Sequence, residues 1–374
     1  MIKSWSYKYE YKLLRNKILK NIDSSLRSGN IFFGSQLKSF EYNFSRNNNI
    51  PYGVAVGSGT DAILISLLAI GIKKGDEVIT VSNTAIATVS AIVSAGGIPK
   101  FVDVNQDYLM NLDELEKKIT KKTKAIIPVH LYGQSCKIDE ICRIAKKFNI
   151  KVIEDCAQAQ GAMFKNKYVG TFGDLSCFSF YPTKILGAYG DGGFVGTKNK
   201  SLFNKIKQIR FYGIDELNKK NKFFKKYYAN VHGINSRIDE IQCSILNLKL
   251  PFVDQYINKR RKVAKIYKEE LKDTGLSLPI ENKNTKHVYH LFVVYHKKRD
   301  LILKKLKKYK FSLSIQYPFP VHSMKGYRKF NKSISLPRTE KFSKGIFSLP
   351  LYPNITTRQV LSFVRILKKI LISV

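Results

Sequence analysis

The sequence predicts an α/β protein in which helices cover both faces of a parallel-rich sheet, followed by a smaller α+β domain. Between residue 52 and about residue 200, short β-branched runs alternate with helix-like segments. Such alternation is typical of parallel sheets that are buried on both faces. The pattern changes near Pro251, so we expect a large domain with an N-terminal bracing segment over residues 1–250 and a small domain over 251–374.

The large domain contains six predicted strands and several helices. The strands are EVITV at 77–81, IPKFVDV at 98–104, KAIIPVH at 124–130, KVIED at 151–155, DLSCFSF at 174–180 and GGFVGT at 192–197. The predicted helices are bracing helices within residues 1–50, a buried helix from AILISLLAIGI at 62–72, and DEICRIAKKF at 139–148. The segment RIDEIQCSILNLKL at 237–250 predicts the helix that closes this domain.

The small domain begins with a basic helix around residues 256–271. A strand is predicted from YHLFVVYH at 289–296, a second basic helix at 299–309, and a further strand from FSLSIQYPFP at 311–320. A last helix, TRQVLSFVRILKKIL at 357–371, closes the chain.

The composition is that of a globular protein, with 44% hydrophobic and 25% charged residues in 374. No run approaches the ~20 apolar residues that span a bilayer, and the start lacks the layout of a signal peptide. We therefore expect a cytoplasmic protein without a membrane partner. The five cysteines lack a CxxC pair or neighbouring histidines, which favours reduced thiols and no metal site.

The net charge of +37 is unusual, with 65 basic against 28 acidic residues. One interpretation is a polyanionic partner, either nucleic acid or a phosphorylated substrate. The other is solvated lysine scattered over exposed faces, which the spread of the lysine runs favours. No nucleic-acid-binding motif accompanies the charge, so we expect no specific nucleic-acid partner.

Three segments could build a ligand site at the carboxyl ends of the strands, where such sheets bind ligands. The first is GSGTDAILISLL at 57–68, in which a glycine-rich turn leads into an apolar helix. Free amides at a helix start attract phosphate, and glycine lets it approach the backbone closely. A strand-to-helix turn without a ligand is an equally good interpretation of this segment.

The second segment is KVIEDCAQAQGA at 151–162, where Asp155 ends an apolar strand. A partly desolvated carboxylate needs a cationic or hydrogen-bonded partner. Strand alternation places Glu154 on the opposite face, and Gln158 is close enough to reach the same ligand as Asp155. Alternatively, Asp155 caps the next helix.

The third segment is SFYPTKILGAYGDGGFVGT at 179–197, with Lys184 between a strand and a glycine-rich loop. A loop lysine is usually solvated, but apolar and aromatic residues surround this one. Burial favours the neutral amine, which is a nucleophile. Ser179 is a candidate phosphate ligand. An anion-binding turn, a strand-ending carboxylate and a buried lysine, in this order, are the parts that a pyridoxal-phosphate site requires.

Five motifs in this order resemble those of the DegT/DnrJ/EryC1/StrS group of nucleotide-sugar aminotransferases, which are pyridoxal-phosphate enzymes of fold type I. The motifs are GSGTDA, PVHLYGQ at 128–134, EDCAQAQGA, SFYPTK followed by GDGG, and GINSRIDEIQ at 233–242. The resemblance extends from GSQLKSFE at 34–41 to SLPLYPNITTRQV at 348–360. It implies an aspartate-aminotransferase-like large domain with a mixed, mostly parallel seven-stranded sheet.

The resemblance also implies roles for the cofactor-binding residues. Lys184 would bind the cofactor covalently, Asp155 would meet the ring nitrogen, and Gln158 would lie on the ring hydroxyl side. The phosphate would be held by Gly59, Thr60 and Ser179.

Two further implications concern a neighbouring subunit and the substrate. Asn235 would reach the cofactor phosphate of the neighbouring subunit, which implies a homodimer with shared active sites. His322 and Tyr317 lie in IQYPFPVH at 315–322, which matches a family segment near the sugar pocket. A structural role for His322 is the alternative.

The sequence departs from the family pattern at one position. Many relatives place an aromatic residue that stacks on the cofactor ring in a motif of the form N-T-aromatic-I-A-T. This chain has NTAIAT at 83–88, and Ala85 cannot stack. Another residue must therefore cover the ring, or that face is open to the sugar.

The forms HLYGQ and SFYPTK followed by GDGG resemble the branch that acts on 3-keto sugars. The resemblance thus implies transfer of the amino group of L-glutamate to C3 of a dTDP-linked 3-keto-6-deoxyhexose. The products would be a dTDP-3-amino-3,6-dideoxyhexose and 2-oxoglutarate, with pyridoxamine phosphate as the intermediate cofactor form. A UDP-linked 3-keto sugar or a 4-keto sugar is an alternative substrate. A non-catalytic regulatory relative is an alternative of another class, which the retained Lys184 and Asp155 disfavour.

Overall fold

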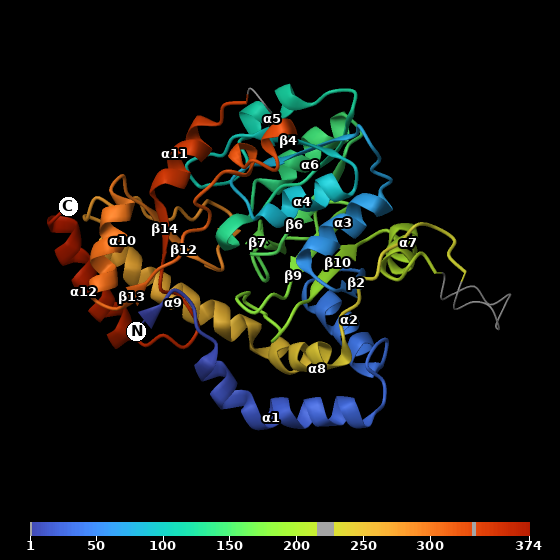
Figure 1. Ribbon diagram of the computed structural model, residues 1–374, viewed down its shortest axis with the longest axis horizontal. Coiled ribbons are helices and arrows are strands. Elements are labelled where there is room, and N and C mark those ends of the chain that lie inside the picture. The colour runs from blue at the N-terminus through green and yellow to red at the C-terminus, as the bar shows by residue number, and fades with distance from the viewer. Residues whose placement is uncertain (1, 215–227, 331–333) are drawn as a thin grey trace.

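The computed structural model describes residues 2–214, 228–330 and 334–374, and a seven-stranded sheet forms its centre (Figure 1). The strands lie in the order β2 (Tyr52–Val56), β10 (Gly193–Thr197), β9 (Leu175–Ser179), β6 (Lys151–Asp155), β5 (Thr123–Ile126), β3 (Glu77–Val81) and β4 (Ile98–Val102). Strand β10 pairs antiparallel with β2 and β9, and the other four pairings are parallel. The predicted α/β fold class, with a mixed and mostly parallel sheet, is confirmed.

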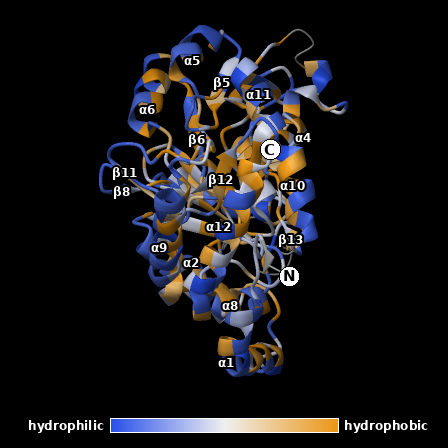
Figure 2. Cartoon of the chain, turned by 90° about the vertical axis from the view of Figure 1, so that its left-hand side faces the viewer, coloured by the Kyte–Doolittle hydropathy of each residue, from blue (hydrophilic) through white to orange (hydrophobic). Residues whose placement is uncertain are grey.

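Helices follow the strands and bury both faces of this sheet. They are α3 (Gly59–Ala69), α4 (Ile86–Ser94), α5 (Leu112–Lys118), α6 (Ile138–Lys147) and α7 (Lys200–Arg210). Successive residues of β6 serve opposite faces: Ile153 packs in the cluster of α3 and α7, and Val152 packs in the cluster that contains α6 residues. In Figure 2 hydrophobic residues gather at the centre, whereas the peripheral α5 and α9 are largely hydrophilic.

The N-terminal segment forms two helices that pack against α8 (Glu240–Lys249), and its bracing role stays a prediction. They are α1 (Lys8–Arg27), which lies along the lower edge of the molecule in Figure 1, and α2 (Ser35–Asn47). The buried carboxylate of Glu240 accepts hydrogen bonds from the amides of Gly34, Gln36 and Leu37, at 2.9, 2.8 and 3.0 Å. It thereby satisfies free amides at the start of α2 and complements its dipole.

The C-terminal part starts with the long helix α9 (Val253–Leu271), directly after a 3₁₀ turn at Leu250–Phe252. It continues with β12 (Phe292–Tyr295), α10 (Arg299–Lys308), β13 (Phe311–Ser312), α11 (Pro337–Gly345), β14 (Ile346–Leu349) and α12 (Thr357–Ile372). Strands β12 and β14 pair antiparallel, and β13 pairs with β1 (Ile2–Lys3) near the N-terminus. The predicted division after residue 250 falls on the 3₁₀ turn and stays a prediction.

Short elements make up the remaining described secondary structure, and one of them, β11, pairs a C-terminal segment with β7. Strands β7 (Met163–Phe164), β8 (Lys167–Tyr168) and β11 (Thr285–Lys286) form a small sheet, and 3₁₀ turns lie at Leu131–Gly133, Val321–Ser323 and Arg328–Phe330. Among the described helices, none combines the length and the apolar character that crossing a bilayer requires.

One predicted strand is shorter than expected, and several strands, β14 among them, were not predicted. The segment 311–320 is a strand only at Phe311–Ser312. Pro318 and Pro320 lack the N–H that a ladder needs, which explains why pairing does not extend through the segment. Strand β2 was not among the predicted strands, because its short sequence YGVAV stands directly before the glycine-rich turn.

A cluster of phenylalanines joins α2 to the sheet. Phe44 is 1% exposed, and its ring lies edge-on to the rings of Phe178, Phe180 and Phe194, with centroids 5.1, 5.1 and 4.7 Å away. Edge-to-face pairs add to the free energy that area burial supplies. This cluster fixes α2 against the strands that carry the cavity described below.

We predict that Phe44→Ala lowers the free energy of unfolding by about 3–5 kcal/mol, because it leaves a cavity among three rings. Urea unfolding followed by circular dichroism measures the change. Tyr42→Ala is the matched control: Tyr42 lies on the same helix but is 63% exposed, so its removal should cost about 0.5 kcal/mol or less. A loss below about 1 kcal/mol for Phe44→Ala would contradict the packing role.

Candidate active site

A cavity of about 220 Å³ opens between the start of α3, the carboxyl end of β6 and the segment that follows β9. It includes five of the predicted site residues: Gly59, Thr60, Asp155, Ser179 and Lys184. The other lining residues are Ser58, Ile63, Ala85, Ala87, Thr88, Ala157, Tyr181, Asp191 and Gly192. The site therefore lies where the fold class places ligands, at the carboxyl ends of parallel strands.

The start of α3 forms the end of the cavity that suits an anion. Ser58 caps the helix by accepting a hydrogen bond from the amide of Asp61 at 3.1 Å. No hydrogen bond within the described residues uses the amides of Gly59 and Thr60. A Cβ on Gly59 would stand 2.7 Å from the Cβ of Ser179, so only glycine permits this approach. Free amides at a helix start beside a serine hydroxyl suit a phosphate.

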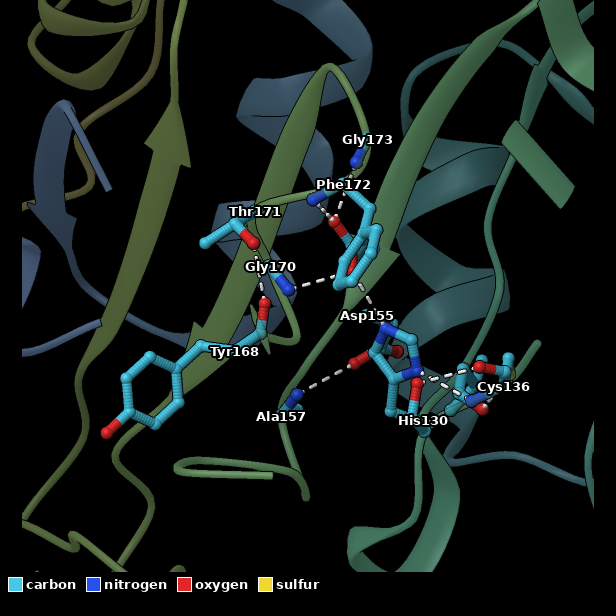
Figure 3. Close-up of polar contacts among 12 residues, drawn as sticks. His130, Cys136, Asp155, Ala157, Tyr168, Gly170, Thr171, Phe172 and Gly173 are labelled. Atoms are coloured by element: carbon cyan, nitrogen blue, oxygen red, sulfur yellow. Dashed lines mark hydrogen bonds and ion pairs between the residues drawn. The ribbon is translucent and has the colours of Figure 1, made fainter. Parts of the chain in front are cut away.

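Asp155 lies at the end of β6 with its carboxylate in the cavity wall. Its Oδ1 accepts a hydrogen bond from the amide of Ala157 at 3.1 Å (Figure 3). Its Oδ2 accepts one from the hydroxyl of Thr88 at 2.8 Å. Burial raises the pKa of Asp155, while the bonds from Thr88 and Ala157 and the nearby Lys184 lower it. Since Asp155 lines the cavity, its carboxylate can pair with a cationic group of a ligand.

Glu154 points to the opposite face, as strand alternation predicts, and its carboxylate is enclosed by the protein. It accepts hydrogen bonds from the amides of Gly170, Phe172 and Gly173, at 2.7, 2.8 and 2.7 Å (Figure 3). His130 Nε2 is a further neighbour at 3.0 Å.

The contacts of His130 determine which of its ring nitrogens carries the proton. The amide of Cys136 donates to His130 Nδ1 at 3.0 Å, so Nε2 carries the proton and donates to Glu154. His130, Glu154 and Cys156 place potential ligand atoms within 4.8 Å of one another. Because these hydrogen bonds occupy the histidine and the carboxylate, the group is a structural network that anchors β6.

Lys184 belongs to a tight loop after β9 and shares the cavity with Asp155. Burial lowers the pKa of Lys184 from its ordinary 10.5 to about 8, and the carboxylate of Asp155 opposes this shift in part. About half of the amine is therefore neutral near pH 8, against well below one per cent for a solvated lysine. The sequence-based expectation of a nucleophilic lysine has a physical basis in this cavity.

Gln158 and Tyr317 lie beside the cavity and contact each other. Gln158 Nε2 donates to Tyr317 Oη at 2.9 Å, and the amide of Tyr132 donates to Gln158 Oε1 at 2.8 Å. Among the described residues the Gln158 carboxamide donates one hydrogen bond, to Tyr317, so its second N–H could serve a ligand. Burial, and secondarily the charge of Asp155, raises the pKa of Tyr317, so its phenol keeps its proton. Tyr317 therefore helps to hold the side chain of Gln158 in place.

Asn235 and His322, like Gln158 and Tyr317, are not among the residues that line the cavity. Asn235 is exposed, and its Oδ1 accepts a hydrogen bond from Arg237 Nε at 2.9 Å. His322 is 7% exposed and lies between Ser82 Oγ, 2.8 Å from Nδ1, and Glu340 Oε1, 3.3 Å from Nε2. Both ring nitrogens of His322 thus have protein partners, as in the structural alternative.

Thr88 and Tyr181 are among the cavity residues that sequence reasoning did not predict as site residues. Thr88 lies in the first turn of α4, within the NTAIAT motif. Its hydroxyl lies one helical turn after Ala85, which also lines the cavity, and this spacing could have indicated that Thr88 reaches the site. Tyr181 follows β9 and is 53% exposed although it lines the cavity. Tyr181 stands before Pro182, just after a strand ends, and this position could have indicated that its side chain lies at the carboxyl ends of the strands.

The residues that line the cavity fit three functional groups of pyridoxal phosphate. Free helix amides and Ser179 suit the phosphate, Asp155 suits a protonated ring nitrogen, and Lys184 supplies a partly neutral amine for the carbonyl carbon. Because residue 59 is glycine, no Cβ fills the space beside Ser179, and this space is where the phosphate would lie. The fold and these residues define a pyridoxal-phosphate enzyme.

The chain belongs to the DegT/DnrJ/EryC1/StrS aminotransferase family, whose model matches residues 12–368. The predicted family, enzyme class and cofactor are confirmed. A dTDP-3-amino-3,4,6-trideoxy-alpha-D-glucose transaminase of Micromonospora megalomicea is 42% identical over 94% of both chains. A dTDP-3-amino-3,6-dideoxy-alpha-D-galactopyranose transaminase of Aneurinibacillus thermoaerophilus is 39% identical over 92% of this chain and 93% of its own. A UDP-N-acetyl-3-dehydro-alpha-D-glucosamine 3-aminotransferase of Acidithiobacillus ferrooxidans is 36% identical over 96% and 95%.

Solved structures share the fold. DesV of Streptomyces venezuelae, crystallised with a reaction intermediate, superposes with a TM-score of 0.93 over 99% of this chain and 98% of its own, at 33% identity. NtdA of Bacillus subtilis, solved with bound pyridoxamine phosphate, gives a TM-score of 0.88 over 95% and 81%, at 31% identity.

We predict that Thr88→Val weakens pyridoxal-phosphate binding about tenfold or more, because a hydrogen bond to a charged group contributes about 1.5–3 kcal/mol. The hydroxyl favours the ionised carboxylate, so its loss raises the pKa of Asp155 further. The carboxylate is then protonated at higher pH, and the defect should grow as the pH falls. Absorbance titration of the cofactor-free protein from pH 8.5 to 6 measures the affinity.

Thr88→Ser is the matched control, since it keeps the hydroxyl and should bind with an affinity within about threefold of the wild type. Equal and pH-independent weakening in both variants would contradict a role for the hydroxyl in tuning Asp155.

Proposed function

We propose that this enzyme transfers the amino group of L-glutamate to C3 of a dTDP-linked 3-keto-6-deoxyhexose. The products are a dTDP-3-amino-3,6-dideoxyhexose and 2-oxoglutarate. The observation that carries the proposal is the cavity in which Lys184, with its lowered pKa, faces the carboxylate of Asp155 beside an anion-binding helix start.

The motifs and the relatives support amination at C3. HLYGQ and the SFYPTK segment resemble the 3-keto branch, and two relatives named above are dTDP-3-amino-sugar transaminases. A UDP-linked 3-keto sugar is the second candidate, because a third relative at 36% identity acts on such a substrate by its name. Tyr181, exposed at the cavity wall after β9, is a candidate contact for the sugar.

The chain's own residues would do the following work in each half-reaction. When bound, the cofactor supplies an electron sink that stabilises negative charge on the carbon that loses its proton. Gly59, Thr60 and Ser179 hold its phosphate, and Asp155 keeps its ring nitrogen protonated. Lys184 Nζ removes the α-proton of glutamate as a general base and delivers a proton as a general acid, which an amine with a pKa of about 8 does efficiently near neutral pH.

We also propose a homodimer with shared active sites. Asn235 is exposed and is not among the residues that line the cavity of its own chain, so a second copy could contact it. Apolar side chains are exposed at and near the glycine-rich and GINSR segments. They are Ile31, Phe32, Ile86, Tyr181, Tyr212 and Val231, each at least 36% exposed. A second copy of the chain would cover them.

A panel of nucleotide-linked keto sugars tests the substrate. With glutamate and pyridoxal phosphate, the dTDP-3-keto-6-deoxyhexose should be aminated, with kcat/KM at least about tenfold above the UDP-3-keto and 4-keto substrates. Product mass and NMR identify the aminated carbon. Lys184→Ala should lower kcat by at least about 10³-fold while the fold is retained.

The outcomes separate the alternatives. Preference for the UDP-linked sugar or amination at C4 would overturn the substrate and leave the aminotransferase intact. No amination of any sugar by protein that has bound the cofactor would favour the regulatory relative.

Complementation tests the shared site. Lys184→Ala and Asn235→Ala chains should each be impaired alone at limiting cofactor. After mixing under conditions of subunit exchange, about half of the dimers are mixed and hold one intact site of two, so about a quarter of wild-type activity should return. Native mass spectrometry of the mixed chains measures how far the exchange has gone. A monomer in solution, or no recovery after proven exchange, contradicts the shared site.

A further inference from the structure

The segment from Ser179 to Ala188, here called the lysine loop, carries Lys184 and closes on itself. The amide of Lys184 donates to the carbonyl of Tyr181, and the amide of Ala188 donates to that of Phe180, each at 2.8 Å. A Cβ on Gly187 would stand 2.6 Å from the carbonyl oxygen of Pro182. The loop is therefore compact, but these bonds leave several of its inner backbone groups without partners inside the loop.

Gln160 supplies partners for three of these groups with one side chain. Its Nε2 donates to the carbonyl of Ser179 at 2.8 Å and to that of Leu186 at 3.2 Å. Its Oε1 accepts from the amide of Leu186 at 2.7 Å. The side chain is 2% exposed, so every bond is formed away from water. The carboxamide thus binds both ends of the loop, with Lys184 between them.

Helix α8 holds the outer side of the same loop. Lys249 Nζ donates to the carbonyl of Gly187 and pairs with Glu10 of α1, both at 2.5 Å. Gln242 Oε1 accepts from the amide of Tyr189 at 2.9 Å. These contacts begin after Leu186, so only Gln160 among the described side chains bonds both the start and the end of the lysine loop.

We propose that Gln160 is a positioning residue for the reaction: it clamps the lysine loop so that Lys184 Nζ is held at the cavity wall. The inference rests on the proposed role of Lys184. Removing the clamp leaves three buried backbone groups without partners, which is unfavourable, so the loop opens more often and these groups bond to water. Small displacements of a reacting group reduce rates strongly, whereas substrate binding depends on other parts of the cavity.

Hydrogen exchange of the cofactor-free protein measures the clamp without catalysis. In Gln160→Met, the peptide covering residues 180–189 should exchange about tenfold or more faster than in the wild type. The matched control is Thr339→Val in α11, which removes one buried hydrogen bond, from Thr339 to Asp103 at 2.7 Å, away from the cavity. It should leave exchange of the 180–189 peptide within about twofold of the wild type.

Kinetics of the loaded enzyme measure the positioning. Gln160→Met should lower kcat about tenfold or more and leave KM for the keto sugar within about threefold, because the interaction acts on Lys184 and not on the substrate. Gln160→Glu serves as a second variant if Gln160→Met does not fold. Its ionised carboxylate faces two carbonyl oxygens, and protonation restores a donor, so its kcat relative to the wild type should rise as the pH falls from 8 to 6.

Each outcome decides a part of the inference. If Gln160→Met leaves hydrogen exchange of the lysine loop unchanged, Gln160 does not clamp the loop, whatever the role of Lys184. Faster exchange with unchanged kcat removes the positioning role and leaves the proposed function intact. A wild-type enzyme that aminates no sugar refutes the proposed function instead, and the exchange experiment still decides whether Gln160 holds the loop.

Discussion

Two consecutive carboxylates at the end of β6 determine how this active site is built. Because successive strand residues face opposite ways, Glu154 and Asp155 cannot share a partner. Three backbone amides and His130 satisfy Glu154 on one face, which fixes the strand end in position. Within the described part of the chain, the carboxylate of Asp155 on the other face accepts hydrogen bonds only from Thr88 and Ala157, and so its charge remains available to a ligand. A single strand thereby supplies both an anchor and a functional group.

The parts of the fold that sequence reasoning predicted well depend on local pattern. The runs EVITV and KVIED match β3 and β6 in both bounds, because apolar β-branched residues between polar ends mark a buried strand. The glycine-rich turn, Asp155 and Lys184 meet in one cavity for the same reason: each follows the carboxyl end of a strand, and a parallel sheet brings these ends together.

What the sequence could not show depends on contacts between distant segments. Gln158 and Tyr317 are 159 residues apart, and nothing local indicates that they form a hydrogen bond. The segment 311–320 has the composition of a strand, but its prolines and its place beside the cavity override that preference. The sequence shows Gln160 only as part of the EDCAQAQGA motif. It does not show that Gln160 forms hydrogen bonds with backbone groups up to 26 residues away.

The pairing of Lys249 with Glu10 has a consequence for biosynthesis. The carbonyl of Gly187, just after the lysine, is held by a cation about 60 residues later in the chain, and that cation is neutralised by an acid close to the first residue. Helix α8 therefore has to leave the ribosome before α1 can pack against it and before the lysine loop gains these contacts. The vitamin-derived group would accordingly be captured late, once most of the polypeptide has emerged.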